Sequence, residues 1–435
     1  MKTPLLIKRN FCLLVLIAML LPVTLHAKDW RGFRGDQGNA TSHETKLPLK
    51  WTDKENIDWR AELPGAGASS PITVGDSIYL TCYSGYAMTK EAPGEMNSLV
   101  RHVVCLNRKD GKIVWVKKFK PQLPESKYSG GNNSWHGYAS STIASDGENL
   151  FVFFGKSGVY CLTLKGKEVW HHSVGNKTRG WGSSNSPLLY KNLVIINASI
   201  ESSSLIALNK KTGKEVWKTG GVKGVWNTPT LVSLPNGQSE IVLSLPGRPI
   251  GSIVGYNPAN GKELWRAKGI PDRGYVCPSV ISHKGIVYAI GGRQNTAVAI
   301  KAGGQGDVTK THQLWSIGKG SNVASPVYHK GHIFWLHERR GVAYCLNAKT
   351  GKIVYEKRIR PRPGIVYSSM LVADGKLYVV SQHNGTYVLA AKPKFELLAH
   401  NTFGKDDSRT NASPIISNGQ ILLRNDKYLY CIGKK

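Results

Sequence analysis

The chain has 435 residues and a formal net charge of +30, and 41% of its residues are hydrophobic. This length allows two or three ordinary domains or one large repeat array, and low-complexity segments are absent. No apolar run after residue 27 is long enough to cross a bilayer, which excludes membrane-spanning helices in the remainder of the chain. The charge favours acidic partners but does not determine the fold.

Residues 1–27 have the pattern of a cleavable secretory signal. Three basic residues precede an apolar run from Phe11 to Leu21, and Ala27 offers a small residue for cleavage. An uncleaved membrane anchor is the alternative. No Cys follows the cleavage site, so we expect a periplasmic or secreted protein without a lipid anchor. Residues 28–55 then form an N-terminal extension.

Residues 56–435 repeat one phrase. "ALNKKTGKEVW" at 207–217 has close relatives at 105–115, 161–170, 255–265 and 345–355. Each copy consists of short alternating runs separated by Gly turns, which predicts antiparallel strands. The eight copies begin at Pro71, Thr142, Pro187, Pro229, Pro278, Pro326, Met370 and Pro414. A period of about 40 to 50 residues with four strands per unit is typical of a β-propeller blade, so we predict an all-β, eight-bladed β-propeller.

The eighth copy supplies only three strands. The segment "NIDWRAELPG" at 56–65 has the form of an outer strand, with Trp59 at the position of the repeat's Trp. We predict that it completes the eighth blade, which joins the two ends of the propeller and removes open sheet edges.

The aromatic residue that ends each copy is expected to pack between neighbouring blades. The residues at this position are Trp59, Trp115, Trp170, Trp217, Trp265, Trp315 and Tyr355, with Phe395 expected in the remaining blade. Burial of aromatic rings at every boundary explains the repetition without catalysis. Four Cys share another repeat position, Cys105, Cys161, Cys345 and Cys431, and read as small buried hydrophobes. The pattern leaves the redox state of Cys82 and Cys277 open.

Connections from strand two to strand three and from strand four to the next blade share one end of a propeller, which we call the loop face. Arginine and aromatic residues gather in these connections, and two insertions at 84–100 and 120–137 fall there too. The candidate ligand-binding residues are Trp135, His136, Arg179, Trp181, Trp226, Arg248, Arg273, Tyr275, Arg293, Arg339, Arg340, Tyr367 and Arg409. Lysines of the Gly-Lys turns occupy the opposite end, the turn face, as a solvated rim.

Guanidinium groups offer planar pairs of donors to carboxylate, sulfate or phosphate and stack on aromatic rings. Loops on a rigid scaffold commonly carry binding sites. The alternative is that these arginines hold loops through backbone carbonyls and scattered acids. The His residues lack metal-ligand spacing, and no phosphate loop or Gly-x-Ser-x-Gly motif is present.

The phrase Ala-Leu-Asn-x-x-Thr-Gly-Lys-x-x-Trp resembles the tryptophan-docking repeat of the pyrroloquinoline-quinone-like propellers over about residues 56–435. That superfamily includes quinoprotein alcohol dehydrogenases and the propeller component of the outer-membrane β-barrel assembly machinery. The opening "DWRGFRGDQGNATS" is similar to that of exported bacterial members of unassigned function. Fold alone does not fix function here.

A quinoprotein dehydrogenase would imply a quinone with Ca²⁺, an Asp base and, in many members, a vicinal disulfide. This chain has no Cys-Cys pair, and the acids expected on the loop face are few: Glu201, Asp272, Glu338, Asp406 and Asp407. Hard cations need several oxygen ligands, which an arginine-rich rim opposes. Trp181 or Trp226 could still support a quinone.

We therefore expect a monomeric binding or scaffold protein without a cofactor, which engages an anionic or extended ligand on the loop face. An acidic polysaccharide and a protein chain are both suitable ligands, and no specific nucleic acid is expected. A periplasmic oxidoreductase that uses pyrroloquinoline quinone with Ca²⁺ on alcohols or sugars is the alternative.

Overall fold

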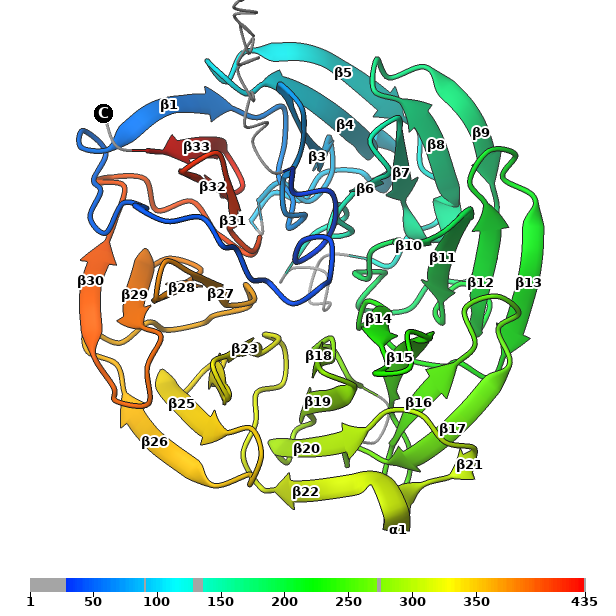
Figure 1. Cartoon of the computed structure of the whole chain (residues 1–435). Helices are drawn as coiled ribbons and strands as arrows, with labels where there is room; N and C mark the ends of the chain where they lie inside the picture. Colours follow the sequence, from blue (N-terminus) through cyan, green and yellow to red (C-terminus); the bar gives the residue numbers. More distant parts are fainter. Residues whose placement is uncertain (1–28, 90, 128–135, 272–274, 434–435) are drawn as a thin grey trace, which may run out of the picture.

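The computed structural model describes residues 29–89, 91–127, 136–271 and 275–433. Eight sheets stand around a central axis in chain order (Figure 1), and each blade begins at the axis and ends at the outer wall. The predicted eight-bladed β-propeller is confirmed.

The first four blades contain sixteen strands in sequence order. They are β2 (Ile72–Val74), β3 (Ser77–Ser84), β4 (Val100–Asn107) and β5 (Ile113–Phe119); β6 (Ala144–Ser145), β7 (Asn149–Phe153), β8 (Val159–Thr163) and β9 (Glu168–His172); β10 (Leu188–Tyr190), β11 (Leu193–Ala198), β12 (Ser204–Asn209) and β13 (Glu215–Gly220); β14 (Thr230–Ser233), β15 (Ser239–Leu245), β16 (Ser252–Tyr256) and β17 (Glu263–Lys268). A short strand, β21 (Gly306–Asp307), extends the fourth blade parallel to β17.

The remaining blades follow the same pattern, and the eighth uses both ends of the chain. They are β18 (Ile281–His283), β19 (Ile286–Gly291), β20 (Thr296–Lys301) and β22 (Gln313–Ile317); β23 (Val327–His329), β24 (His332–Leu336), β25 (Val342–Asn347) and β26 (Ile353–Arg358); β27 (Leu371–Ala373), β28 (Lys376–Val380), β29 (Thr386–Ala390) and β30 (Leu397–Asn401); β31 (Ile415–Ser417), β32 (Gln420–Arg424), β33 (Tyr428–Ile432) and β1 (Ile57–Glu62). The described helical turns are η1 (Met96–Ser98), η3 (Gly155–Ser157) and α1 (Thr309–His312).

The eighth blade closes the ring as predicted. β1 pairs antiparallel with β33, and Trp59 lies opposite Cys431. The fully buried Arg424 then crosses from β32 to the first blade, where its Nη1 donates to the carbonyl oxygen of Thr81 at 2.7 Å and to Ser69 Oγ at 3.1 Å. The two ends of the chain are therefore joined by a strand pair and by a buried cation that satisfies backbone acceptors.

The Gly of the Thr-Gly-Lys turn packs against the indole of the preceding blade. In the third blade, a Cβ on Gly213 would lie 2.6 Å from the Trp170 ring, and φ at this Gly is +69°. Trp170 Nε1 also donates to the carbonyl oxygen of Lys210 at 2.8 Å. The same bond links Trp59 to Arg108, Trp217 to Pro258 and Trp315 to Ala348. Only Gly offers both the positive φ and the space, which explains the repeated phrase.

The seventh blade departs from the prediction. Register places Ala399 opposite Val388, where the sixth blade places Tyr355 opposite Cys345. Phe395 precedes β30 and packs edge-on against Tyr355, with ring centroids 5.7 Å apart. The prediction that Phe395 ends the repeat was therefore wrong, because the docking position of this blade has no aromatic side chain.

The N-terminal extension supplies an indole to this boundary. Trp51 is 1% exposed and belongs to a cluster that contains Ala399 and Tyr378 of the seventh blade and Leu422 of the eighth. Its ring stacks on Tyr378 at 6.5 Å between centroids, and its backbone N–H donates to Asn401 Oδ1 at 3.1 Å. Trp51, a residue outside the repeats, therefore fills the space between the seventh and eighth blades.

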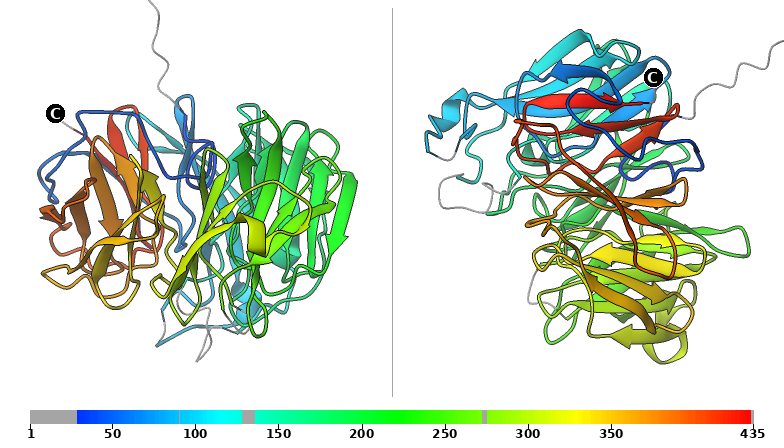
Figure 2. Two further views of the ribbon diagram at one scale, coloured as in Figure 1. Left: turned by 60° about the horizontal axis from the view of Figure 1, so that its bottom comes forward. Right: turned by 90° about the vertical axis from the view of Figure 1, so that its left-hand side faces the viewer.

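The two ends of the cylinder differ. In the right-hand view of Figure 2 the light-blue segment that follows β3 projects from one end, and the dark-blue extension lies at the other. The exposed lysines of the Gly-Lys turns lie on the turn face, as predicted: Lys112, Lys167, Lys214, Lys262 and Lys352. The six described cysteines are free, and the four at the shared repeat position are buried, as predicted. Among the described residues, no helix has the length and apolarity to span a membrane.

We predict that Trp51→Ala destabilises the propeller by about 3–5 kcal/mol, since it leaves a cavity between two blades. Urea denaturation measures the free energy of unfolding. Val216→Ala, at a half-exposed side chain of the outer strand β13, is the control and should change it by less than about 0.5 kcal/mol. Equal effects of the two substitutions on the free energy of unfolding would contradict the packing role of Trp51 between the blades.

Candidate functional site

A pocket of about 130 Å³ lies on the axis at the loop face. Each blade contributes at least one residue to its lining, so the pocket stands at the centre of the ring. The small residues closest to the blade starts are Ala68, Ser140, Ser184, Thr228, Ser279, Ser325, Ser369 and Ser413. Because these residues belong to the innermost segments, the blade arrangement itself fixes their positions.

Hydroxyl groups near the axis connect successive blades. The backbone N–H at one blade start donates to the hydroxyl at the next, for example from Thr228 to Ser279 Oγ at 3.0 Å and from Ser279 to Ser325 Oγ at 3.0 Å. Seven such bonds run from the first blade to the eighth, with lengths from 2.8 to 3.2 Å. The bonds tie the inner edges of the blades together.

These bonds also determine what the pocket offers a ligand. Five hydroxyls that accept such a bond line the pocket: Thr228, Ser279, Ser325, Ser369 and Ser413. A hydroxyl that accepts an N–H keeps its own hydrogen to donate, and none of the five donates to another group in the described part of the chain. Blades four to eight therefore present O–H donors to the axis, and these donors suit an acceptor-rich or anionic group.

Aromatic rings form one wall of the pocket. Tyr275 lies between Trp181 and Trp226, with ring centroids 5.6 and 5.5 Å away. Trp226 Nε1 donates to the carbonyl oxygen of Gly182 at 2.9 Å, which fixes its ring. Burial raises the pKa of Tyr275 far above its ordinary range, so its phenol stays protonated. Tyr367 lines another part of the pocket.

Three of the predicted arginines stand over these rings. The guanidinium of Arg179 lies 5.5 Å from the Trp226 ring centroid, and that of Arg293 lies 5.9 Å from the Tyr275 centroid. Arg339 Nη2 donates to Tyr367 Oη at 3.3 Å. All three side chains belong to exposed residues, so they can reach a ligand above the aromatic wall.

The other predicted residues have different positions. His136 lines the pocket, bonds Ser140 Oγ through Nδ1 at 2.6 Å, and has a pKa lowered to about 4 by burial. Arg409 Nε pairs with Asp426 at 2.9 Å. The described lining contains no arginine, so Arg179, Arg293 and Arg339 lie beyond its edge, and Arg248, Arg340 and Arg409 do not line it either. Trp135 and Arg273 lie outside the described residues, as does Asp272.

Described carboxylates do not line the pocket. The lining contains no Asp or Glu among the described residues, which likewise hold no group of three potential metal ligands. Glu338 Oε2 accepts from Ser321 Oγ and from the Asn322 N–H, both at 3.0 Å. Glu201 is 1% exposed and accepts from Ser183 Oγ. Burial raises the pKa of Glu201 from 4.5 to about 7, while the Ser183 bond acts in the opposite direction.

Comparisons with known proteins agree with this geometry at the level of the fold. A family model described as outer membrane protein assembly factor BamB matches residues 100–316 and 305–428. The chain belongs to this family. No curated protein matches the sequence.

Solved structures similar to this BamB family member include another BamB and two dehydrogenases. BamB from Moraxella catarrhalis shares 10% identity, with a TM-score of 0.57 over 86% of this chain and 98% of that chain. A europium-containing methanol dehydrogenase shares 14%, with a TM-score of 0.65 over 91% and 89%. The quinohemoprotein alcohol dehydrogenase from Comamonas testosteroni shares 12%, with a TM-score of 0.59 over 94% and 81%. At such identities the likeness shows the fold alone.

Two features of the site were missed from the sequence. The series of hydroxyls was missed because four of the five adjoin prolines, the fifth, Ser369, precedes Met370, and all look like ordinary strand starts. Phe33 also lines the pocket, although it comes from the N-terminal extension. The similar sequence context of the blade starts was a usable signal for the first feature, whereas no local signal places Phe33 at the axis.

The raised pKa of Glu201 predicts a pH-dependent effect of Glu201→Gln. The folded protein holds the Glu201 proton more tightly than the unfolded chain does, so wild-type stability falls as pH rises from about 4.5 to about 7. The variant lacks this titration. Its free energy of unfolding relative to wild type should therefore increase by roughly 3 kcal/mol from pH 4.5 to pH 8.

Urea denaturation at both pH values measures this difference. Glu148→Gln, at an exposed residue, is the control and should show no comparable change. A pH-independent difference between Glu201→Gln and wild type would contradict the assigned direction of the pKa.

Proposed function

We propose that this protein is an exported, periplasmic binding protein whose axial pocket engages the acidic group of an extended ligand. The observation that carries the proposal is the series of O–H donors from blades four to eight, which lies beneath an aromatic wall and an arginine rim. Donors converge on the axis from several blades, while carboxylates are absent from the described lining. Such a site favours a ligand that supplies acceptors and negative charge.

An acidic polysaccharide suits these groups best. The half-buried rings of Trp181 and Tyr367 can contact sugar rings, and the hydroxyls can donate to a carboxylate. The exposed arginines can bind the acidic groups of further units. The net charge of +30 increases the encounter rate with a polyanion. A protein chain is the other candidate ligand, and the name of the matched family, an assembly factor, supports it.

A quinoprotein oxidoreductase is the second candidate function. The similarity to methanol and alcohol dehydrogenases supports it. The residues of the pocket are poorly suited to a quinoprotein oxidoreductase. The described lining offers hydroxyls and aromatic rings but no carboxylate to hold a calcium ion with a quinone. Of the described acids predicted on this face, Glu201 and Glu338 are buried and accept bonds from their own blades. Asp406 accepts from Asn425 and Tyr430 of the eighth blade, and neither Asp406 nor Asp407 lines the pocket.

The rim arginines provide the first test. We predict that Arg293→Ala combined with Arg339→Ala weakens binding to polygalacturonate by about tenfold or more, since each arginine contributes a charge-assisted contact. Lys214→Ala combined with Lys262→Ala removes the same charge from exposed residues of the turn face. Retention on immobilised polygalacturonate is measured against salt. If both double variants elute at equally lowered salt concentrations, retention depends only on general charge and the proposal is contradicted.

The cofactor test separates the two candidates. Pyrroloquinoline quinone and Ca²⁺ are added to the purified protein, and the absorbance spectrum and dye reduction with alcohols or sugars are recorded. We expect neither a saturable cofactor spectrum nor dye reduction, because the pocket lacks the carboxylate donors that the ion requires. Saturable binding with turnover would establish the oxidoreductase instead.

A further inference from the structure

The N-terminal extension borders the axial pocket from the turn side. On the turn side, a second hollow of about 230 Å³ is lined by residues 31–38 of the extension and by the innermost strands β6, β10 and β14. Phe33 lines both this hollow and the axial pocket, as do Thr228 and Ser279. Phe33 therefore lies at the junction of the two spaces and forms the floor of the axial pocket.

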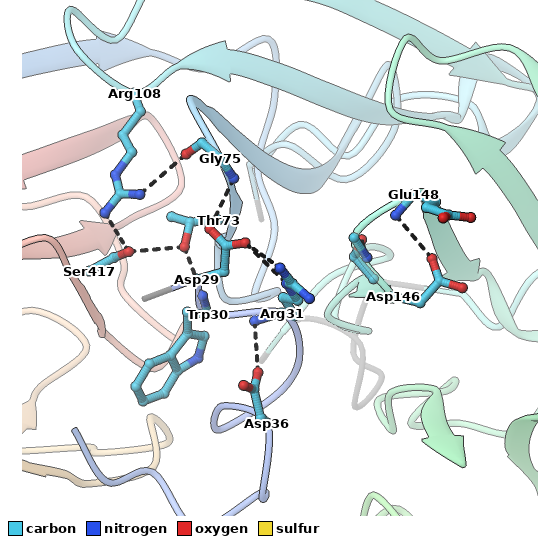
Figure 3. A network of polar contacts seen from close by, with 12 residues as sticks. Asp29, Trp30, Arg31, Asp36, Thr73, Gly75, Arg108, Asp146, Glu148 and Ser417 are labelled. Carbon is cyan, nitrogen blue, oxygen red and sulfur yellow. Dashed lines mark hydrogen bonds and ion pairs between the residues drawn. The ribbon is translucent and has the colours of Figure 1, made fainter. Parts of the chain in front are cut away.

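The segment that carries Phe33 is fixed on one side to the first two blades (Figure 3). Asp29 Oδ1 accepts from the Gly75 N–H at 2.9 Å, and the carboxylate also pairs with Arg31 at 2.8 Å. The Trp30 N–H donates to Thr73 Oγ1 at 2.8 Å, and Thr73 Oγ1 is bonded in turn to Ser417 Oγ. The N–H of Ser145 in the second blade donates to the Arg31 carbonyl oxygen at 2.8 Å.

The residue after Phe33 is fixed to the other side of the ring. Arg34 is 3% exposed, and its guanidinium donates to the carbonyl oxygens of Pro326 in the sixth blade and of Gly38. Farther along, Asn39 Oδ1 accepts from the Ser282 N–H of the fifth blade at 3.3 Å. Because residues on both sides of Phe33 bond to different blades, the extension spans the axis and holds the ring of Phe33 there.

This closure limits how a ligand can enter. A polymer cannot thread through the ring, and a pocket of about 130 Å³ is smaller than the roughly 300–1,000 Å³ of sites for drug-sized ligands. Only a small unit can occupy it. We propose that the pocket binds the terminal acidic unit of a glycan end-on, with Phe33 as the floor that stops the chain. This inference rests on the proposed function.

End-on binding assigns a role to each part of the site. The terminal uronic acid rests on Phe33, its carboxylate accepts from the hydroxyls of Ser279, Ser325 and their equivalents, and its ring contacts the aromatic wall. The next units emerge past Arg293 and Arg339. Phe33 is therefore a specificity-determining residue, which selects chain ends over internal segments.

The stoichiometry of the wild-type protein tests this inference without any variant. Isothermal titration is carried out with galacturonic acid and with oligogalacturonides of increasing length. We expect one protein molecule per chain at every length, with an affinity that stops increasing after the first few units. A number of bound molecules that grows with length would show side-on binding and overturn the inference, although the proposed function would stand.

Substitution of Phe33 tests its role as the floor. We expect Phe33→Ala to weaken galacturonic acid binding about tenfold, because the pocket then opens into the second hollow. Phe33→Leu keeps an apolar side chain and should retain most of the affinity. Thermal unfolding verifies that both variants are folded. Unchanged affinity of folded Phe33→Ala for galacturonic acid would contradict the role of Phe33 as the floor of the pocket.

Failure of the underlying function gives a different result. If wild-type protein does not bind any of the oligogalacturonides, or binds them equally well after Arg293→Ala with Arg339→Ala, the loop-face site itself is disproved. If binding depends on the arginines but neither on Phe33 nor on chain ends, only the end-on inference is lost.

Discussion

Contact between an aromatic ring of one blade and a glycine of the next holds this structure together. The glycine backbone lies against the indole, and the indole N–H bonds a carbonyl oxygen beside that glycine, as in the pair Trp170 and Gly213. The repeat of this contact sets the spacing between blades. Since the spacing determines where each inner strand begins, it also positions the serine and threonine hydroxyls around the axis.

The site depends on this frame in two ways. Hydroxyls such as those of Ser279 and Ser325 lie at the axis because successive blade starts are bonded to one another. The aromatic wall lies above them because the connections carrying Trp181, Trp226 and Tyr275 leave neighbouring blades at the same end. A rigid frame with short inner segments thus produces a preorganised set of donors, whereas the exposed arginines at the rim can adapt.

The sequence was sufficient to predict the blade count, the closure by Trp59 and the buried repeat cysteines, because each depends on a local pattern that recurs. Phe395 was assigned wrongly since its blade lacks the Thr-Gly-Lys phrase, and aromatic character alone could not fix the register that places Ala399 at the docking position. The roles of Trp51 and Phe33 were not predictable, because Trp51 packs on Tyr378 of the seventh blade and Phe33 lines a pocket to which all eight blades contribute. Of the predicted arginines, Arg179, Arg293 and Arg339 contact the pocket aromatics, while Arg409 pairs with Asp426. Sequence patterns indicated at which end of the cylinder these arginines lie, but not which group each guanidinium contacts.

The wedge at Trp51 has a consequence for folding. Its partners Tyr378 and Ala399 and the strand pair of β1 with β33 connect residues 51–62 to the seventh and eighth blades. Such contacts have very high sequence separation, so they form late and slow the approach to the native state. Until β31–β33 have been synthesised, β1 has no partner strand and the nascent array stays an open arc. Chaperone protection would therefore matter most for this protein during synthesis rather than after the ring is complete.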